Sequence, residues 1–381
     1  PGGKITVATP FRVKIPTSFS RLGHVEQSYQ ITQWYPKPAV YDQDGWHPMP
    51  YLDQGEFYSE FGTFDVKITL PANYIVGASG DLLTKNETLW MDSFIDGHLK
   101  PWLKEGFPES ATQTKTLHYQ LENAHDFAWF ADKRFKVIKD EATLPSGRKV
   151  TTWAMYTSTP RQKGMMQTIV PWKNGAKYVA NAIEHYSKYL GEYPYNVATA
   201  VEGALSAGGG MEYPTITIVG SAGTKKQLET VTVHEVGHFW LYGILGTNER
   251  RYPWMDEGIN SFYENLYFED RYPNQTLIES DGINKALDLG WAKRAYQSQL
   301  FYLYSASQNR DQALGLTSED YTSTNYGAIV YGKGAVAMKY LHGYLGDSIY
   351  DAAMHRYYDE WKFKHPQPED LKQVLETSTG K

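Results

Sequence analysis

Cysteine is absent from this 381-residue sequence. Its absence excludes disulfide bonds, a thiol nucleophile and any metal site built on cysteine ligands. It does not decide the redox compartment, because a chain without thiols is safe in oxidising and reducing surroundings alike. A metal site in this chain would need ligands other than thiolate.

Long apolar runs and basic clusters are missing as well. No segment approaches eighteen consecutive apolar residues, so we expect no transmembrane segment. The net charge of −6 and the lack of Lys/Arg-rich runs argue against a nucleic-acid partner. The opening residues PGGKITVATP lack the features of a signal peptide, and we expect the chain to be a piece of a longer protein. Nothing in the composition indicates an oligomeric state.

The sequence does have enough apolar residues for ample cores, with 41% hydrophobic and 21% charged residues. Its length suits two or three domains. Its 30 tyrosines and 11 tryptophans suggest aromatic-lined clefts, although most of these rings are expected in cores and half-buried sheets.

The patterning changes once along the chain. Up to about residue 158, alternating segments such as GRKVTTWAMY and frequent Pro and Gly predict strands. Beyond it, helical spacing dominates residues 165–191, 225–242, 256–272 and 327–346, with short strands at YNVATAVEG and TITIVGS. The predicted fold class is α+β: an all-β domain over residues 1–158, followed by a mainly helical domain with a small sheet over residues 159–381.

The segment VTVHEVGHFW, residues 231–240, is the strongest candidate for a functional site. His234 and His238 are four residues apart, so on a helix they lie on one face and can hold one ion, with Glu235 close to its open side. A catalytic zinc site needs a third protein ligand. Glu257 is the candidate, because it begins another helix nineteen residues after His238 among apolar and aromatic neighbours, where a buried carboxylate needs a cation.

The spacing H-E-x-x-H, eighteen residues and then Glu resembles the gluzincin aminopeptidases, the family of aminopeptidase N, the alanyl and leucyl aminopeptidases and leukotriene hydrolase. Two further motifs carry the resemblance, GGGMEYP at residues 208–214 and YGKG at residues 331–334. Together the three motifs cover roughly residues 200–345. The resemblance implies a saddle-like N-terminal β domain, a thermolysin-like catalytic domain and one zinc ion per chain. Family members usually continue into a helical C-terminal domain, which we expect to be missing here.

The expected chemistry is hydrolysis by a zinc-activated water. Zinc held by His234, His238 and Glu257 would lower the pKa of its water ligand. Glu235 would act as general base and then return the proton to the leaving amine. The family resemblance assigns stabilisation of the oxyanion to Tyr331.

The GGGMEYP segment is expected to bind the substrate. Its glycines, including Gly209 and Gly210, allow close backbone approach, and an edge strand containing Met211 could pair with an extended peptide. The resemblance implies that Glu212 holds the free α-amino group of the substrate. The family asparagine after this glutamate is replaced by Tyr213.

A second amine anchor is expected near TQWYP, residues 32–36, where Gln33 is the candidate. The family's usual acidic position nearby is Tyr35 in this sequence. The loss of that carboxylate could weaken amine binding or widen the substrate range.

These features predict a zinc aminopeptidase acting on peptides with a free N-terminus. A zinc endopeptidase and a catalytically silent binding protein that keeps the fold are the alternatives, and leukotriene-type epoxide hydrolysis is confined to a narrow branch of the family. The aromatic-rich composition and similarity to exported bacterial relatives favour a periplasmic or secreted location. The side-chain preference and physiological substrate do not follow from the sequence.

Overall fold

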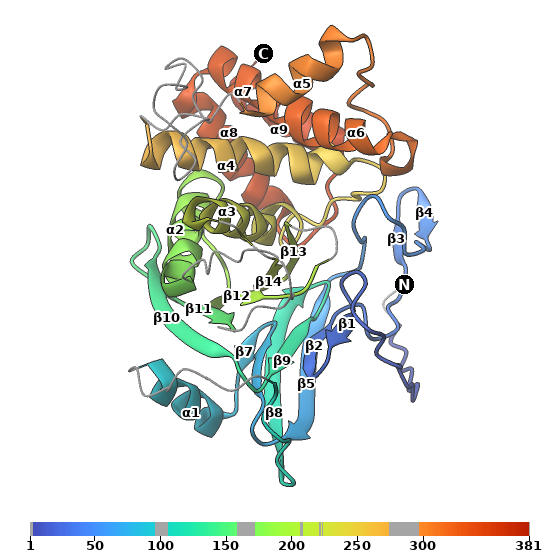
Figure 1. Cartoon of the computed structure of the whole chain (residues 1–381). Helices are drawn as coiled ribbons and strands as arrows, with labels where there is room; N and C mark the ends of the chain where they lie inside the picture. The colour runs from blue at the N-terminus through green and yellow to red at the C-terminus, as the bar shows by residue number, and fades with distance from the viewer. Residues whose placement is uncertain are drawn as a thin grey trace.

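The computed structural model describes residues 3–95, 106–157, 172–205, 209–220, 222, 224–273 and 297–380. The chain forms a β-rich N-terminal region, a central five-stranded sheet and a helical region beyond it (Figure 1). The expected α+β class is confirmed.

The N-terminal region contains three small sheets. One has the strand order β1-β2-β9-β6, another β5-β8-β7, and β3 and β4 form a hairpin. The strands are β1 (Gly23–Val25), β2 (Ser28–Ile31), β3 (Val40–Asp42), β4 (Gly45–His47), β5 (Gly62–Pro71), β6 (Ile75–Ala78), β7 (Asp81–Leu82), β8 (Thr114–Ala124) and β9 (Trp129–Asp132). One helix, α1 (Lys85–Ile95), comes between β7 and β8 in the chain, and the sequence pattern did not predict it.

The central sheet has the order β10-β11-β12-β14-β13. Its strands are β10 (Lys136–Thr143), β11 (Lys149–Tyr156), β12 (Val197–Glu202), β13 (Gly210–Tyr213) and β14 (Ile216–Val219). β11, β12 and β14 run parallel, while β10 and β13 are antiparallel to their neighbours. β13 is therefore an edge strand, with its outer backbone groups outside the sheet ladder.

The helical region covers one face of this sheet. α2 packs on β10, β11 and β12, and α3 packs on β13 and β14 (Figure 1). The helical elements are η1 (Trp172–Asn174), α2 (Gly175–Tyr189), α3 (Lys225–Leu241), η2 (Trp254–Gly258), α4 (Ile259–Arg271), α5 (Gln297–Ser307), η5 (Ser318–Asp320), α6 (Ser323–Asn325), η6 (Tyr326–Lys333), α7 (Gly334–Leu345), α8 (Asp347–Trp361) and α9 (Pro368–Thr379). None of the helices in the described part of the chain is both long and apolar enough to cross a membrane.

The opposite face of the sheet shares a core with the N-terminal region. Ile75 and Phe130 from the N-terminal strands are buried with Trp153, Val201 and Ile218 from the sheet. β10 and β11 thus belong to the central sheet although they precede the expected domain boundary at residue 158. Residues 158–171, around that expected boundary, lie outside the described residues.

Candidate metal and peptidase site

Helix α3 presents the two histidines of the expected site. The helix begins after Thr224, whose side chain accepts a hydrogen bond from the backbone N–H of Gln227 at 3.1 Å and so caps the first turn. His234 and His238 lie one turn apart on the same face, and their Nε2 atoms are 3.2 Å from each other. His238 is buried and His234 is partly buried.

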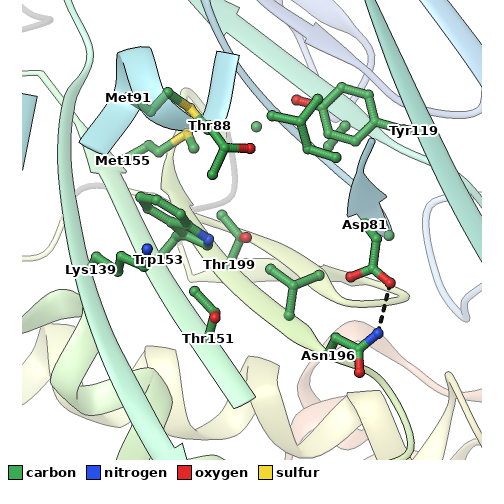
Figure 2. A pocket seen from close by; sticks show the side chains of 15 residues that line it. Asp81, Thr88, Met91, Tyr119, Lys139, Thr151, Trp153, Met155, Asn196 and Thr199 are labelled. Carbon is green, nitrogen blue, oxygen red and sulfur yellow. Dashed lines mark hydrogen bonds between the residues drawn. The ribbon is translucent and has the colours of Figure 1, made fainter. Parts of the chain in front are cut away.

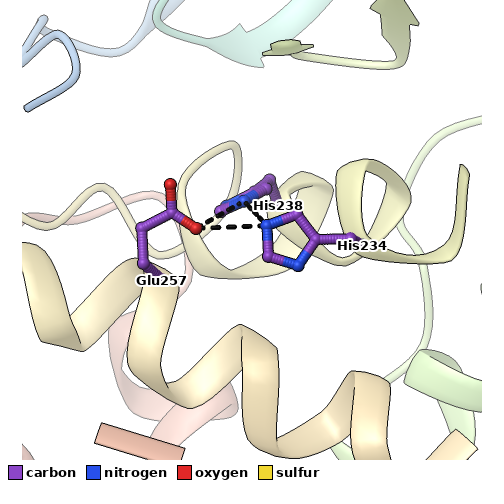
Figure 3. Close-up of side chains that lie close together, drawn as sticks. All are labelled: His234, His238 and Glu257. Carbon is purple, nitrogen blue, oxygen red and sulfur yellow. Dashed lines mark hydrogen bonds and ion pairs between the residues drawn. The ribbon is translucent and has the colours of Figure 1, made fainter. Parts of the chain in front are cut away.

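Glu257 completes a cluster of three ligand atoms. It lies in η2, a π-helical turn that leads into α4, and π-helical turns are frequent at functional sites. Its Oε2 atom is 3.2 Å from Nε2 of His234 and 3.2 Å from Nε2 of His238 (Figure 3). Tetrahedral zinc with bonds of roughly 2.0–2.1 Å separates its ligand atoms by roughly 3.3–3.4 Å, so this donor set fits the ion. The three side chains converge as the sequence predicted.

Two further carboxylates hold the imidazole rings. Asp256 Oδ1 lies 2.6 Å from Nδ1 of His238, and Glu264 Oε2 lies 3.1 Å from Nδ1 of His234. Each Nδ1–H can donate to its carboxylate, which leaves Nε2 as the lone-pair donor for a metal. The sequence reasoning missed both residues. Glu264 follows Glu257 by seven residues, two helical turns, and that spacing could have revealed it.

The charges of the cluster favour a cation. Burial of His234 opposes its charged form, but hydrogen bonds to Glu257 and Glu264 raise its pKa to about 10. Burial likewise opposes the charge on His238, and Asp256 and other nearby carboxylates raise its pKa well above the usual value. The negative potential that retains protons on these rings also attracts a divalent cation.

Glu235 lies beside the cluster and against strand β13. It is buried, and its Oε2 atom has no hydrogen-bond partner among the described residues. Burial raises the pKa of its carboxyl to about 7. A Cβ atom placed on Gly210 would lie 2.5 Å from the Glu235 side chain, so only glycine fits at that point of the strand. Gly210 therefore has a direct steric role beside the candidate base.

Tyr331 reaches the cluster from η6, a second π-helical segment that continues into α7. Its hydroxyl donates a hydrogen bond to Oε1 of Glu257. Gly258 and Gly334 bring η2 and η6 together, because a Cβ on Gly334 would lie 2.8 Å from Cα of Gly258. The second glycine of YGKG thus permits the close approach of Tyr331 and Glu257. Burial raises the pKa of Tyr331 well above 10 and keeps its hydroxyl protonated.

Side chains along strand β13 alternate between the two faces of the central sheet, because successive residues of a strand point to opposite faces. Glu212 shares the α3 side with Gly210. One carboxylate oxygen of Glu212, a nitrogen of His238 and an oxygen of Asp256 lie within 4.8 Å of one another. Met211 is buried in the core on the opposite face, so only its backbone is available to a peptide.

Glu212 is nearly inaccessible, with 4% of its surface exposed. Its Oε1 atom has no hydrogen-bond partner in the described part of the chain. Burial raises the pKa of its carboxyl well above the usual value, His238 opposes this rise, and the charge of Glu56 adds to it. Gly209, directly before the strand, is exposed and has a φ of 69°, and Gly208 lies outside the described residues.

Gln33 and Tyr35 have different partners. Oε1 of Gln33 accepts a hydrogen bond of 3.3 Å from the hydroxyl of Tyr213, the residue that replaces the family asparagine. Gln33 has the unusual φ of 45°, and its Nε2 atom is buried without a partner among the residues described. Tyr35 donates its hydroxyl hydrogen to Asp126 at 3.1 Å.

A cavity of about 240 Å³ lies elsewhere, between β6, β7, β8, α1 and strands β10–β12 (Figure 2). Trp153, Met91 and Met155 provide apolar lining, and Asp81, which also lines the cavity, accepts a hydrogen bond of 2.8 Å from Asn196. None of the residues of the metal cluster contributes to its lining. The cavity is separate from the candidate site.

Comparison with known proteins assigns residues 174–381 to a family model described as the peptidase family M1 domain. Aminopeptidase M1-A of Oryza sativa subsp. japonica is 21% identical over 161 residues, which are 42% of this chain and 17% of that protein. Aminopeptidase N of Lactobacillus delbrueckii subsp. lactis is 25% identical over 163 residues, 41% of this chain and 17% of that protein. The matches thus span less than a fifth of these relatives.

Solved structures extend the similarity over most of the chain. The M1 zinc metallopeptidase of Deinococcus radiodurans has a TM-score of 0.56 at 17% identity, covering 85% of this chain and 62% of that one. A mutant of it has been solved with a Tyr-Ser-Ala substrate. Legionella pneumophila aminopeptidase A, in complex with aspartic acid, has a TM-score of 0.60 at 12% identity and covers 94% of this chain and 36% of that one. At these identities the likeness establishes the fold.

Proposed function

This chain belongs to peptidase family M1, and from that premise we propose that it is a zinc-dependent aminopeptidase that binds one zinc ion and removes the N-terminal residue of peptides. The observation that carries the proposal is the buried carboxyl group of Glu212: it lies close to His238 of the metal cluster, and its Oε1 atom has no hydrogen-bond partner among the described residues. A substrate ammonium group is the natural partner for such an oxygen.

His234, His238 and Glu257 would hold the metal through Nε2, Nε2 and Oε2. When bound, zinc in such a donor set acidifies a water molecule and polarises a substrate carbonyl. Asp256 and Glu264 can accept the Nδ1 protons of the two rings, which would leave both Nε2 atoms available to the metal.

Glu235 moves the proton of the reaction. Its buried carboxyl, with the pKa raised to about 7, suits a base that accepts a proton from water near neutral pH and passes it to the leaving amine nitrogen. Gly210 leaves the space that this side chain occupies. Oε2 of Glu235, which has no hydrogen-bond partner in the described part of the chain, is the candidate acceptor atom.

Tyr331 supplies a hydrogen-bond donor. Its hydroxyl retains its proton because burial raises its pKa, and it points to the Glu257 side of the cluster. A donor at this point can stabilise negative charge that develops on the scissile carbonyl oxygen. We therefore assign Tyr331 to transition-state stabilisation.

Glu212 and the edge strand β13 together favour an exopeptidase. The strand can pair with an extended peptide through its free backbone edge, and Glu212 limits how far the peptide extends, because its carboxylate would hold the terminal ammonium. An endopeptidase needs no such anchor. A silent binding protein would need no candidate base, yet Glu235 lies beside the complete metal cluster.

The test compares one peptide with its N-acetylated form, using the zinc-loaded protein and its Glu212→Ala variant. We expect the wild type to cleave the free peptide far faster, because acetylation leaves Glu212 desolvated without a partner. Glu212→Ala should slow cleavage of the free peptide specifically. Equal rates for the two peptides in the wild type would support the endopeptidase alternative, and no cleavage of either by stoichiometrically zinc-loaded protein would support the binding protein.

A further inference from the structure

The cavity between the N-terminal strands and the central sheet has an apolar interior and a charged opening. Met91 on α1 and Met155 on β11 line it and are buried, with 4% and 3% of their surfaces exposed. Lys139 and Asn196 belong to the same lining but are exposed, and Asp81 is partly buried. The lining thus suits a ligand that has an apolar group and also carries charge.

The size of the cavity sets the size of that ligand. The cavity measures about 240 Å³, whereas an engineered apolar cavity of about 150 Å³ binds benzene. It therefore has room for an aromatic ring and several further atoms. Trp153 on β11 also lines the cavity, and aromatic rings favour contact with one another in tilted or offset arrangements.

A carboxylate lies at one end of the cavity. Nδ2 of Asn196 donates a hydrogen bond of 2.8 Å to Oδ2 of Asp81 (Figure 2). This contact orients the carboxylate and leaves its Oδ1 atom able to accept from a ligand. An ammonium group is the ligand group that forms the strongest hydrogen bond with such an oxygen.

An ammonium group of the protein lies at the other end. Nζ of Lys139 is 4.9 Å from the centroid of the Trp153 ring and 3.0 Å from Oδ1 of Asp92 on α1. The side chains of this ion pair are 35% and 37% exposed, and pairs with such exposure stabilise a fold little. Nζ has three N–H donors, so Lys139 can bind a ligand carboxylate while it keeps its contact with Asp92.

The two charged ends are too far apart for a single amino acid. Lys139 lies opposite Trp153, which lies opposite Thr199, so Lys139 is two strands or about 10 Å from β12. Asn196, which holds Asp81, precedes Thr199 by three residues, and Figure 2 shows it at the end of the cavity away from Lys139. Two extended residues span about 7 Å, and a hydrogen bond of about 3 Å at each end brings the reach to about 13 Å. A dipeptide therefore fits this separation.

Hydrogen bonds hold the wall between β6 and β7 in place. The backbone N–H of Gly80, which lines the cavity, donates to Oγ1 of Thr215 at 2.8 Å, and the N–H of Ser79 donates to the carbonyl oxygen of Ala128 at 2.9 Å. These contacts tie the wall to the turn between β13 and β14 and to the segment before β9. A preformed site of this kind costs a ligand little ordering of the protein.

We propose that this cavity is a second peptide-binding site, separate from the metal cluster, and that it takes a dipeptide with an aromatic C-terminal residue. Asp81 binds the α-ammonium group and Lys139 binds the carboxylate. The aromatic side chain packs against Trp153, because this ring lies beside Lys139. The site requires binding only and does not depend on the proposed hydrolysis.

The test is calorimetric titration with glycyl-phenylalanine of the zinc-loaded Glu235→Gln protein, which lacks the candidate base and so does not consume the peptide. Asp81→Asn and Lys139→Gln, made in that background, each remove one charge of the cavity. Asp53→Asn and Lys67→Gln are the matched controls, because both residues are exposed and neither lines the cavity.

We expect two peptides to bind per chain, one at the metal cluster and one in the cavity. Lys139→Gln should weaken binding in the cavity by roughly tenfold but leave binding of the C-terminally amidated peptide unchanged, because the amide has already lost the charge that Lys139 binds. Asp81→Asn should weaken the cavity site similarly and leave the N-acetylated peptide unaffected. The two control variants should match the background protein.

Thr151→Trp is a further variant in case a charge variant does not fold. Thr151 is a partly buried lining residue, so a larger side chain there fills the cavity and should abolish binding at this site.

The proposal is overturned if only one peptide binds and its affinity is lowered by Glu212→Ala but by neither Asp81→Asn nor Lys139→Gln; that result leaves the proposed aminopeptidase intact. It is also overturned if the folded charge variants weaken the free and blocked peptides equally, because the charges would then act through the fold. Binding in the cavity without binding at the metal cluster would support the second site and count against the proposed function.

Discussion

Replacing Gly210 by alanine tests the steric relation between strand β13 and the candidate base. The added methyl carbon would lie 2.5 Å from Cγ, Cδ and Oε1 of Glu235, whereas carbon atoms in contact are ordinarily about 3.5–4.0 Å apart. Either the strand or the carboxyl group must therefore move by about 1 Å. A misplacement of about 1 Å in a catalytic group can lower the rate by about a hundredfold.

We expect Gly210→Ala to lower kcat by about a hundredfold while zinc content stays at the wild-type level, because the three metal ligands are not displaced. The assay is hydrolysis of an amino-acyl anilide by zinc-loaded protein, with metal content measured on the same sample. Gly343→Ala, on an exposed part of α7, is the control, because its added Cβ meets no atom of the described residues within 4 Å.

A double variant separates displacement of the base from other effects of the methyl group. In a Glu235→Gln background the base is already lost, so adding Gly210→Ala should lower the residual rate very little. Wild-type kcat in folded, zinc-loaded Gly210→Ala would refute the reasoning. A further hundredfold loss in the Glu235→Gln background would show that the methyl group acts on something other than the base.

Three other predictions follow from single contacts. Asp256→Asn should weaken zinc binding by about tenfold, because the amide oxygen still accepts the Nδ1–H of His238 but without full charge; competition with a chelating dye measures this, and an unchanged Kd contradicts it. Gly334→Ala should lower kcat with zinc retained, because its methyl group would meet Gly258 Cα at 2.8 Å and separate η6 from η2; wild-type turnover would show that the segments adapt. Burial lowers the pKa of His185 to about 4, so the unfolded chain binds a proton between pH 4 and 6.5 that the folded protein does not. Its contribution to the free energy of unfolding should therefore fall by about 1.4 kcal/mol per unit as pH drops through this window, and urea unfolding of His185→Gln should lack that part of the slope.

Local spacing was enough to predict the metal cluster. His234 and His238 share a helix face because residues four apart always do. Helix α3, expected over residues 225–242, spans Lys225–Leu241. Glu257 could be added because a carboxylate among apolar neighbours needs a cation. These inferences depend on helical periodicity and on burial, and both properties are visible within a few tens of residues.

The tertiary structure alone decided which distant groups meet this cluster. Arg250, in the loop that follows α3, donates hydrogen bonds to the carbonyl oxygens of Gln54 and Glu56, which are 196 and 194 positions earlier in the chain. The sequence pattern also did not predict that β10 and β11 belong to the central sheet. β11 pairs in parallel with β12, and the pattern changes from strand-like to helical between these two strands, near residue 158. Periodicity reports which face of an element is buried. It carries no information on the path of the loops that decide which partner covers that face.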